Sequence, residues 1–203
     1  MNRNITLPEA LPARFALDPK HKLTDDEYFE FCAARPDLRI ERTAEGEIVI
    51  VPPAGYESSR HETEVVRQLA NWAIRDGRGG VSGPSAAFFL SDGSSFSPDA
   101  AWLSNEAYSA LTRKQRRQFP PVCPEFVVEV MSASDRLRAA KAKMERWTAN
   151  GAQLGWLIDG DAKTVYIYRP GQPAEKRTGI LELAGEGPVE SFVLDLGPIW
   201  AGA

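Results

Sequence analysis

Two carboxylates stand out because they lie in stretches that are otherwise apolar. Glu129 is in the middle of residues 126–131 (FVVEVM), and Asp99 directly follows Pro98 in the stretch SPDAAWL. A short, β-branched apolar run bounded by turn residues is typical of a buried strand. A carboxylate buried there is normally protonated, paired with a cation or bound to a metal ion. Two such acids on neighbouring strands could hold a hard divalent cation such as Mg²⁺ through oxygen ligands.

The alternation of side chains along a strand decides which way Glu129 points. Val127, Glu129 and Met131 share one face, and the remaining residues of the run share the other. Pro98 indicates that the strand carrying Asp99 begins there or lies at an edge of its sheet. Two simpler interpretations stay open. Asp99 can be a turn residue, and Glu129 can be half of a buried salt bridge.

The elements around these acids predict an α/β or α+β domain with a mixed central sheet and helices on its faces. Long amphipathic helices are expected over residues 57–76 and 135–149, and a shorter helix is expected from the N-cap Thr24 to about residue 34. A further helical segment, residues 105–116, carries a basic run. Strands are expected over residues 38–42, 47–51, 86–90, 97–103, 126–131, 154–159 and 164–170, with short pieces at 181–184 and 191–196.

Length and composition are those of an ordinary globular protein. The chain has 203 residues, of which 43% are hydrophobic and 26% charged, so we expect a single domain over residues 23–203 after an extended, proline-rich arm over residues 1–22. No apolar run approaches ~18 residues, so no membrane span is expected. The two cysteines, Cys32 and Cys123, match no metal spacing. Together with the absence of a signal-peptide core in the first 25 residues, they favour a reducing, cytoplasmic location.

The charge distribution does not by itself predict a nucleic-acid-binding surface. The net charge is −4, but a local patch matters more than the total. The run RKQRR over residues 113–117 is such a patch, and its simpler interpretation is a solvated helix end.

The spacing of the two acids resembles that of a known group of nucleases. The stretch SPD at residues 97–99, followed thirty residues later by FVVEV, resembles the PD-(D/E)xK nuclease superfamily. The pieces SxSD at 132–135, KM at 143–144, NG at 150–151 and GWLID at 155–159 resemble the Uma-two family, which is grouped with restriction endonucleases. The resemblance covers residues 40–195. It implies a restriction-endonuclease-like fold, a Mg²⁺ or Mn²⁺ site, and hydrolysis of phosphodiester bonds in nucleic acid, with DNA as the expected substrate.

The resemblance also implies roles for particular residues. Asp99 and Glu129 match the two acids of the motif, but Met131 stands where the standard motif has its lysine. A methionine can neither donate a proton nor help to activate water. In this family the lysine has moved to the following helix, where Lys143 matches it. Helical geometry alone does not choose between Lys143 and Lys141, because both flank the buried stripe of that helix at similar angles.

Two further metal ligands are expected from the same resemblance. The carbonyl of Val130 is one, and a glutamate of the first long helix is the other. Glu64 fits the family register and is preferred, whereas Glu62 projects closer to the apolar stripe of that helix, so the two arguments disagree. The neighbouring His61 is more simply a surface residue.

Other functions remain open on the sequence alone. Met131 and the net negative charge favour a catalytically inactive member that keeps the fold and binds nucleic acid or protein. A homodimer is also expected. Its interface could use four aromatic residues, although aromatic residues at such positions are more often core. These residues are Trp102, Trp156, Tyr166 and Tyr168.

Overall fold

The computed structural model describes residues 13–15, 22–133 and 135–201, with side chains described for the last two ranges. The predicted arm over residues 1–22 therefore lies almost wholly outside the described residues, apart from the short strand β1 (Ala13–Phe15) and Lys22. The single domain over residues 23–203 stays a prediction. No helix in the described ranges is long and apolar enough to cross a membrane.

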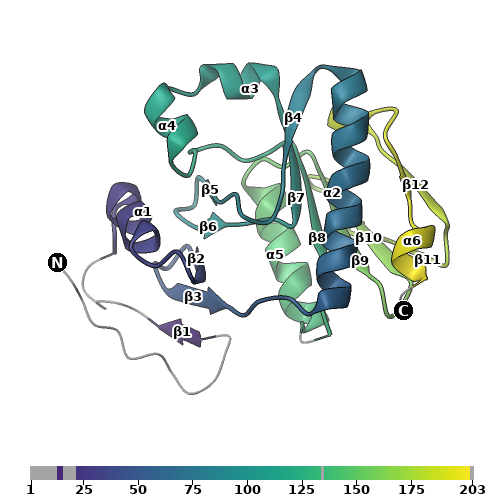
Figure 1. The fold of residues 1–203 in the computed structure, drawn as a ribbon, viewed down its shortest axis with the longest axis horizontal. Coiled ribbons are helices and arrows are strands. Elements are labelled where there is room, and N and C mark those ends of the chain that lie inside the picture. The colour runs from purple at the N-terminus through teal and green to yellow at the C-terminus, as the bar shows by residue number, and fades with distance from the viewer. Residues whose placement is uncertain (1–12, 16–21, 134, 202–203) are drawn as a thin grey trace.

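A six-stranded mixed sheet forms the centre of the molecule (Figure 1). Its neighbouring strands are antiparallel except β8 and β9, which are parallel. In spatial order the strands are β11 (Glu175–Thr178), β10 (Thr164–Tyr168), β9 (Leu154–Asp159), β8 (Phe126–Val130), β7 (Ala100–Ser104) and β4 (Gly79–Ser82). The predicted fold class, a mixed α/β sheet flanked by helices, is confirmed.

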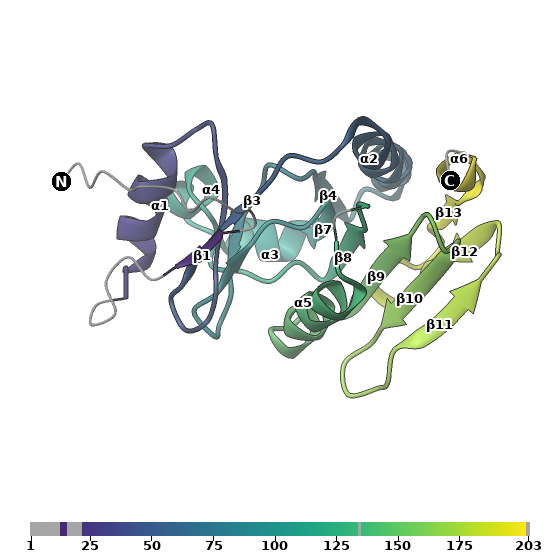
Figure 2. The ribbon, with the colours of Figure 1, turned by 90° about the horizontal axis from the view of Figure 1, so that it is seen from below.

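The two long helices cover opposite faces of this sheet (Figure 2). Helix α2 (Tyr56–Asp76) packs its buried stripe, including Leu69, on the face that carries Val128 and Val130. Helix α5 (Leu137–Ala149) packs Met144 and Trp147 on the other face. The predicted alternation along β8 is therefore confirmed, and Glu129 lies on the side of α5.

Smaller elements lie beside α2 on the same face of the central sheet (Figure 2). They are the hairpin of β12 (Glu182–Ala184) and β13 (Val193–Asp195), the 3₁₀ turn Gly187–Val189 and the short helix α6 (Gly197–Trp200). Their apolar residues join the core on that face of the sheet and contact one side of α2, whose outer face stays exposed to solvent.

A second, five-stranded sheet lies beside the first, at the N-terminal end of the chain (Figure 1). Its order is β1, β3 (Ile48–Val51), β2 (Arg39–Arg42), β6 (Ser95–Phe96) and β5 (Phe88–Phe89). Helix α1 (Asp25–Ala33) packs against it through the buried Tyr28, whose hydroxyl donates to the Ile40 carbonyl at 3.0 Å. Thr24 caps α1 as predicted, through a capping box with Glu27.

One short segment joins the two sheets and places Asp99. Strand β6 ends at Phe96 in the small sheet, and β7 begins at Ala100 in the central sheet. Residues 97–99 therefore cross from one sheet to the other. As a result, β2 of the small sheet lies next to the start of β7.

Several local expectations were wrong. The helix predicted over residues 105–116 is two helices, α3 (Asn105–Ala110) and α4 (Arg113–Arg117), because Thr112 caps a new helix through Gln115. Strands β4, β6 and β11 were not predicted, because their sequences are glycine-rich, very short or charged.

The four aromatic residues offered as a dimer interface are instead core residues. Each of them is at most 7% exposed. The homodimer stays a prediction, and these aromatics do not support it. The four are Trp102, Trp156, Tyr166 and Tyr168.

Candidate functional site

Asp99 directly precedes strand β7 and faces Glu129 on the adjacent strand β8. Ala100 pairs with Val128 in the antiparallel β7–β8 ladder, so the next position outward brings Asp99 opposite Glu129. Both residues are buried, with 5% and 8% of their surface exposed. One carboxylate oxygen of Asp99 accepts the backbone N–H of Val130 at 2.8 Å. This bond holds Asp99 against the end of β8, and the role of the Val130 carbonyl as a ligand stays a prediction.

Glu129 is held by two residues of the following helix, α5. Lys143 Nζ lies 3.0 Å from the Glu129 carboxylate, and Trp147 Nε1 donates to it at 2.8 Å. Lys141 does not reach this site, because its ammonium lies 4.1 Å from the centre of the Tyr166 ring. The structure therefore brings Lys143 rather than Lys141 to the acids, which helical geometry alone could not decide.

Glu41 on β2 is a third acid of the site, and sequence reasoning missed it. Its Oε1 accepts from Lys143 Nζ at 2.9 Å and from the Ser97 backbone N–H at 3.2 Å. Lys143 also donates to the Ser97 carbonyl at 3.2 Å. Lys143 therefore joins three segments: β2, the crossing segment and β8. Alternation in the hairpin put Glu41 on its polar face but did not indicate what that face contacts.

Arg39, two residues before Glu41, is the second cation of the site. Its Nη2 donates to Asp99 Oδ1 at 3.3 Å and to the Ser97 carbonyl at 3.0 Å. Burial alone would lower the pKa of Arg39, but the charges of Asp99, Glu41 and Glu129 outweigh burial and raise this pKa. Arg39 therefore remains a cation beside Asp99.

The charges of the cluster also determine the protonation of Lys143. Burial raises the pKa of Glu129, Asp99 and Glu41 raise it further, and Lys143 opposes them. Burial would lower the pKa of Lys143, but the carboxylates of Glu129 and Glu41 outweigh burial and raise it. Lys143 is therefore a firmly protonated ammonium in the metal-free protein. It can donate hydrogen bonds and offset negative charge, but it cannot accept a proton.

Of the two glutamates on α2, Glu62 is the one whose pKa responds to the charge of Asp99. Glu62 is 8% exposed, and burial and then the charge of Asp99 raise its pKa to about 7. Among the described residues it has no hydrogen-bond or ion-pair partner. Glu64 instead binds Arg67 and Gln68, and Gln68 in turn binds the backbone of Asp195. The role of Glu64 as a metal ligand stays a prediction, and in this structure its carboxylate is held by Arg67 and Gln68.

The structure also shows where His61 and the basic run of residues 113–117 lie. His61 is not a surface residue, since it is 7% exposed and its ring packs against Gly160. The basic run on α4 is a solvated helix, as its simpler interpretation proposed. Lys114 pairs with Asp26, and Arg116 donates to the carbonyl of Tyr108.

The donor chemistry of the site fits a hard divalent cation. In residues 22–133 and 135–201, no three His, Cys, Asp or Glu side chains are grouped as a ready metal site. Magnesium, however, typically takes only one or two protein carboxylates and completes its shell with water and substrate phosphate. Asp99 and Glu129 provide two carboxylates, and Glu62, which has no partner in the described residues, lies within electrostatic range of Asp99.

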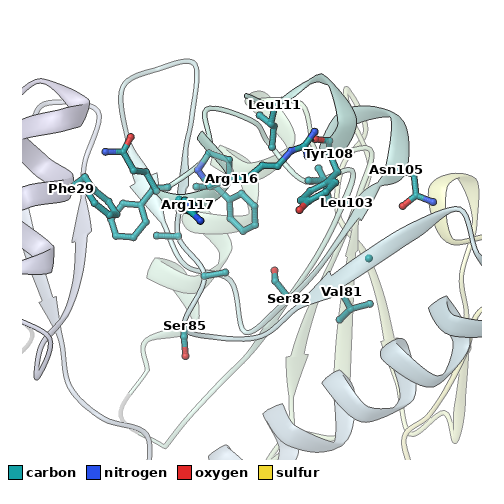
Figure 3. A pocket seen from close by; sticks show the side chains of 17 residues that line it. Phe29, Val81, Ser82, Ser85, Leu103, Asn105, Tyr108, Leu111, Arg116 and Arg117 are labelled. Atoms are coloured by element: carbon teal, nitrogen blue, oxygen red, sulfur yellow. The ribbon is translucent and has the colours of Figure 1, made fainter. Parts of the chain in front are cut away.

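A cavity of about 500 Å³ lies elsewhere, between β4 and the helices α3 and α4 (Figure 3). Its walls are mostly apolar, with Val81, Leu103 and Phe119 among them, and Arg116 and Arg117 lie at its side. Asp99, Glu129 and Lys143 are not among its lining residues. The acids and the cations of the candidate site are therefore separate from this cavity.

Comparison with solved structures shows that the fold has been seen before in an α/β protein. A crystal structure described as "a putative nuclease belonging to DUF820", from Anabaena variabilis, superposes with a TM-score of 0.71 at 20% sequence identity. The match covers 89% of this chain and 98% of that one. At this identity the likeness shows the fold alone.

Comparison with protein families gives a more specific result. The Uma2 family model, described as "Putative restriction endonuclease", matches residues 25–196. The chain therefore belongs to the Uma2 family, and the resemblance inferred from the motifs is confirmed. No curated protein is similar enough in sequence to count as a relative.

Proposed function

We propose that the protein is an endonuclease that hydrolyses phosphodiester bonds of DNA with Mg²⁺ or Mn²⁺. The observation that carries the proposal is the convergence of Asp99, Glu129 and Lys143 from three elements, with Lys143 Nζ 3.0 Å from Glu129. Membership of a family described as restriction endonucleases supports a nuclease, and the choice of DNA and of the metal goes beyond that description.

Asp99 and Glu129 would hold the metal ion, with Glu62 and the carbonyl of Val130 as further oxygen ligands. A bound divalent cation polarises the scissile phosphate and lowers the pKa of a bound water molecule. The raised pKa of Glu62, about 7, fits a ligand that gains its full charge when a cation arrives.

The residues of the chain then have distinct tasks. Lys143 is protonated, so it donates to the attacking water or to a phosphate oxygen and offsets negative charge that accumulates in the transition state. Lys143 thereby supplies the positive charge that Met131, at the lysine position of the standard motif, cannot supply. Glu41 and the Ser97 carbonyl hold the ammonium, and Trp147 orients Glu129. Glu41 and Trp147 are positioning residues.

One specific observation favours the alternative, a catalytically inactive protein that binds nucleic acid. Both carboxylate oxygens of Asp99 already accept hydrogen bonds, from Val130 and Arg39, so a stable metal-free cluster exists. Such a protein would bind nucleic acid without cutting it. Mg²⁺ would not raise its melting temperature.

The test is cleavage of a supercoiled plasmid and of labelled DNA and RNA oligonucleotides with Mg²⁺ or Mn²⁺. Wild type is compared with Asp99→Asn and Glu129→Gln, which keep the side-chain shape, and with Lys141→Met as a control outside the site. We expect cutting by wild type and Lys141→Met, and loss of about 10²-fold or more in the two acid variants. Equal cutting in all four proteins would refute the site, and no cutting by wild type would favour the inactive alternative.

A further inference from the structure

Part of the hydrogen-bonding capacity of Arg39 is unused. Its Nη2 contacts Asp99 and the Ser97 carbonyl. Its Nε is buried and has no partner in the part of the chain that the structure describes. The Arg39 side chain is 27% exposed, whereas the Asp99 side chain is 7% exposed. The Nε of Arg42 is likewise buried without a partner in the described residues, so the features that distinguish Arg39 are its partial exposure and its contact with a buried acid of the site.

Arg42, two residues further along β2, shows what a structural arginine looks like in this protein. Its side chain is 4% exposed and pairs with Asp25. Its guanidinium lies over the rings of Tyr28 and Phe89, and it donates to the Leu23 carbonyl. Arg42 thus fastens α1 to the small sheet. Arg39 has no aromatic partner in the described residues and faces the acids.

Arg39 also differs from Lys143 in the acid with which it forms an ion pair. Lys143 pairs with Glu129 and Glu41, so Arg39 is the only described cation in an ion pair with Asp99. A metal ion on Asp99 would take over the role of its counter-charge. The planar fork of Arg39 would then be available for an anion.

We infer that Arg39 is a further catalytic residue that binds a non-bridging oxygen of the scissile phosphodiester, and that it competes with the divalent cation for Asp99 when no substrate is bound. This inference rests on the proposed function. A guanidinium suits the role because it binds phosphate oxygens through two parallel N–H donors. The inference has a consequence that a structural role lacks: loss of Arg39 weakens substrate binding but strengthens metal binding.

The experiment measures these two bindings separately, without relying on cleavage. Binding of a fluorescein-labelled 20-base-pair DNA duplex is followed by anisotropy in Ca²⁺, with a gel to verify that the duplex stays intact. Binding of Mg²⁺ alone is followed by titration calorimetry. The proteins are wild type, Arg39→Met, Arg39→Lys and Arg67→Met. Arg67 serves as the charge control, because its side chain is 58% exposed and pairs with Glu64 away from the acids.

We expect Arg39→Met to bind the duplex about tenfold or more weaker, the usual size for a hydrogen bond to a charged group, and to bind Mg²⁺ more tightly. Arg39→Lys should keep the Mg²⁺ affinity of wild type and lose part of the duplex affinity, because it keeps the charge without the fork. Arg67→Met should change neither by more than about threefold. If Arg39→Met does not fold, Arg39→Lys carries the test through its duplex affinity.

Other outcomes overturn the inference. Unchanged duplex binding in Arg39→Met and Arg39→Lys shows that Arg39 does not bind phosphate, and weaker binding of both duplex and Mg²⁺ shows a structural role. Absence of duplex binding by wild type also overturns it. The proposed function fails separately: if wild type binds the duplex through Arg39 but cuts nothing, only the hydrolysis proposal falls. If wild type cuts and Arg39→Met cuts equally well, only the role of Arg39 falls.

Discussion

Lys143 Nζ lies 3.0 Å from the Glu129 carboxylate, and this contact joins the middle of helix α5 to the C-terminal end of strand β8. The same ammonium reaches Glu41, 102 residues earlier in the chain. The pair therefore fastens the small N-terminal sheet to the central sheet at the position where the acids meet. Its removal should affect both stability and the proposed chemistry.

Replacement of Lys143 by methionine should destabilise the protein by about 3 kcal/mol, because breaking a buried ion pair leaves its partners uncompensated. Only 20% of the Lys143 side chain and 10% of the Glu129 side chain are exposed. Urea unfolding at pH 7 measures the loss. Lys141→Met is the matched control, since Lys141 lies over Tyr166, and it should cost about 1 kcal/mol or less. Equal losses in the two variants would contradict the assignment.

Glu62 should make stability depend on pH in a direction opposite to that of an ordinary paired acid. Its pKa is about 7 in the folded protein, against an ordinary value of 4.5. Between these values the folded state binds more protons than the unfolded state, so the contribution of Glu62 becomes more unfavourable as pH rises from about 4.5 to about 7. Glu62→Gln should therefore gain stability over wild type across this range, with a constant difference above it.

Urea unfolding at pH 5, 6, 7 and 8 without metal tests this dependence, and Glu64→Gln is the control. The hydrogen bond from Arg67 lowers the pKa of Glu64, so its stabilising contribution is present above the unfolded pKa and is lost only as pH falls through the folded pKa. Glu64→Gln should therefore be slightly less stable than wild type at all four values. A Glu62→Gln difference that is the same at pH 5 and pH 8 would show that Glu62 is not desolvated.

Trp147 should contribute to the site through its indole N–H as well as through packing. Trp147→Phe removes the 2.8 Å hydrogen bond to Glu129. Trp102→Phe is the matched control, because Trp102 is also buried but its Nε1 has no partner in the described residues. The difference in unfolding free energy between the variants should be about 1.5 kcal/mol or more, the usual contribution of a hydrogen bond to a charged group. Equal destabilisation would mean that the hydrogen bond contributes nothing.

Two adjacent glycines of β4 should respond differently to alanine. A Cβ at Gly79 would overlap the carbonyl oxygen of Leu103 and the ring of Trp102, whereas a Cβ at Gly80 would meet nothing within 4 Å. Gly79→Ala should therefore lower the unfolding free energy by about 1–3 kcal/mol, and Gly80→Ala should change it by about 0.5 kcal/mol or less. Thermal and urea unfolding of the two variants measure this. A neutral Gly79→Ala would show that β4 does not pair with β7 in this register.

Local periodicity was sufficient to predict several features of the fold. Apolar stripes at helical spacing located α2 and α5, and alternation along residues 126–131 put Glu129 on the face opposite to Val128 and Val130. The motif around Asp99 and Glu129 was sufficient to indicate the family, which the match over residues 25–196 confirms. These signals lie within single elements or in the order of elements, so they can be recognised in the sequence without knowledge of how the elements pack.

Which long side chains contact the carboxylates of the site depends on tertiary packing, and the sequence did not predict it. Lys141 and Lys143 flank the same stripe symmetrically, and only the position of β2 and the crossing segment on one side brings Lys143 to Glu129 and Glu41. Glu62 and Glu64 were distinguished by the contact of Glu64 with Arg67 and Gln68. Arg39 and Glu41 entered the site because the crossing segment binds β2 to the start of β7. Such contacts between distant segments have no local signature, since the packing of whole elements determines them.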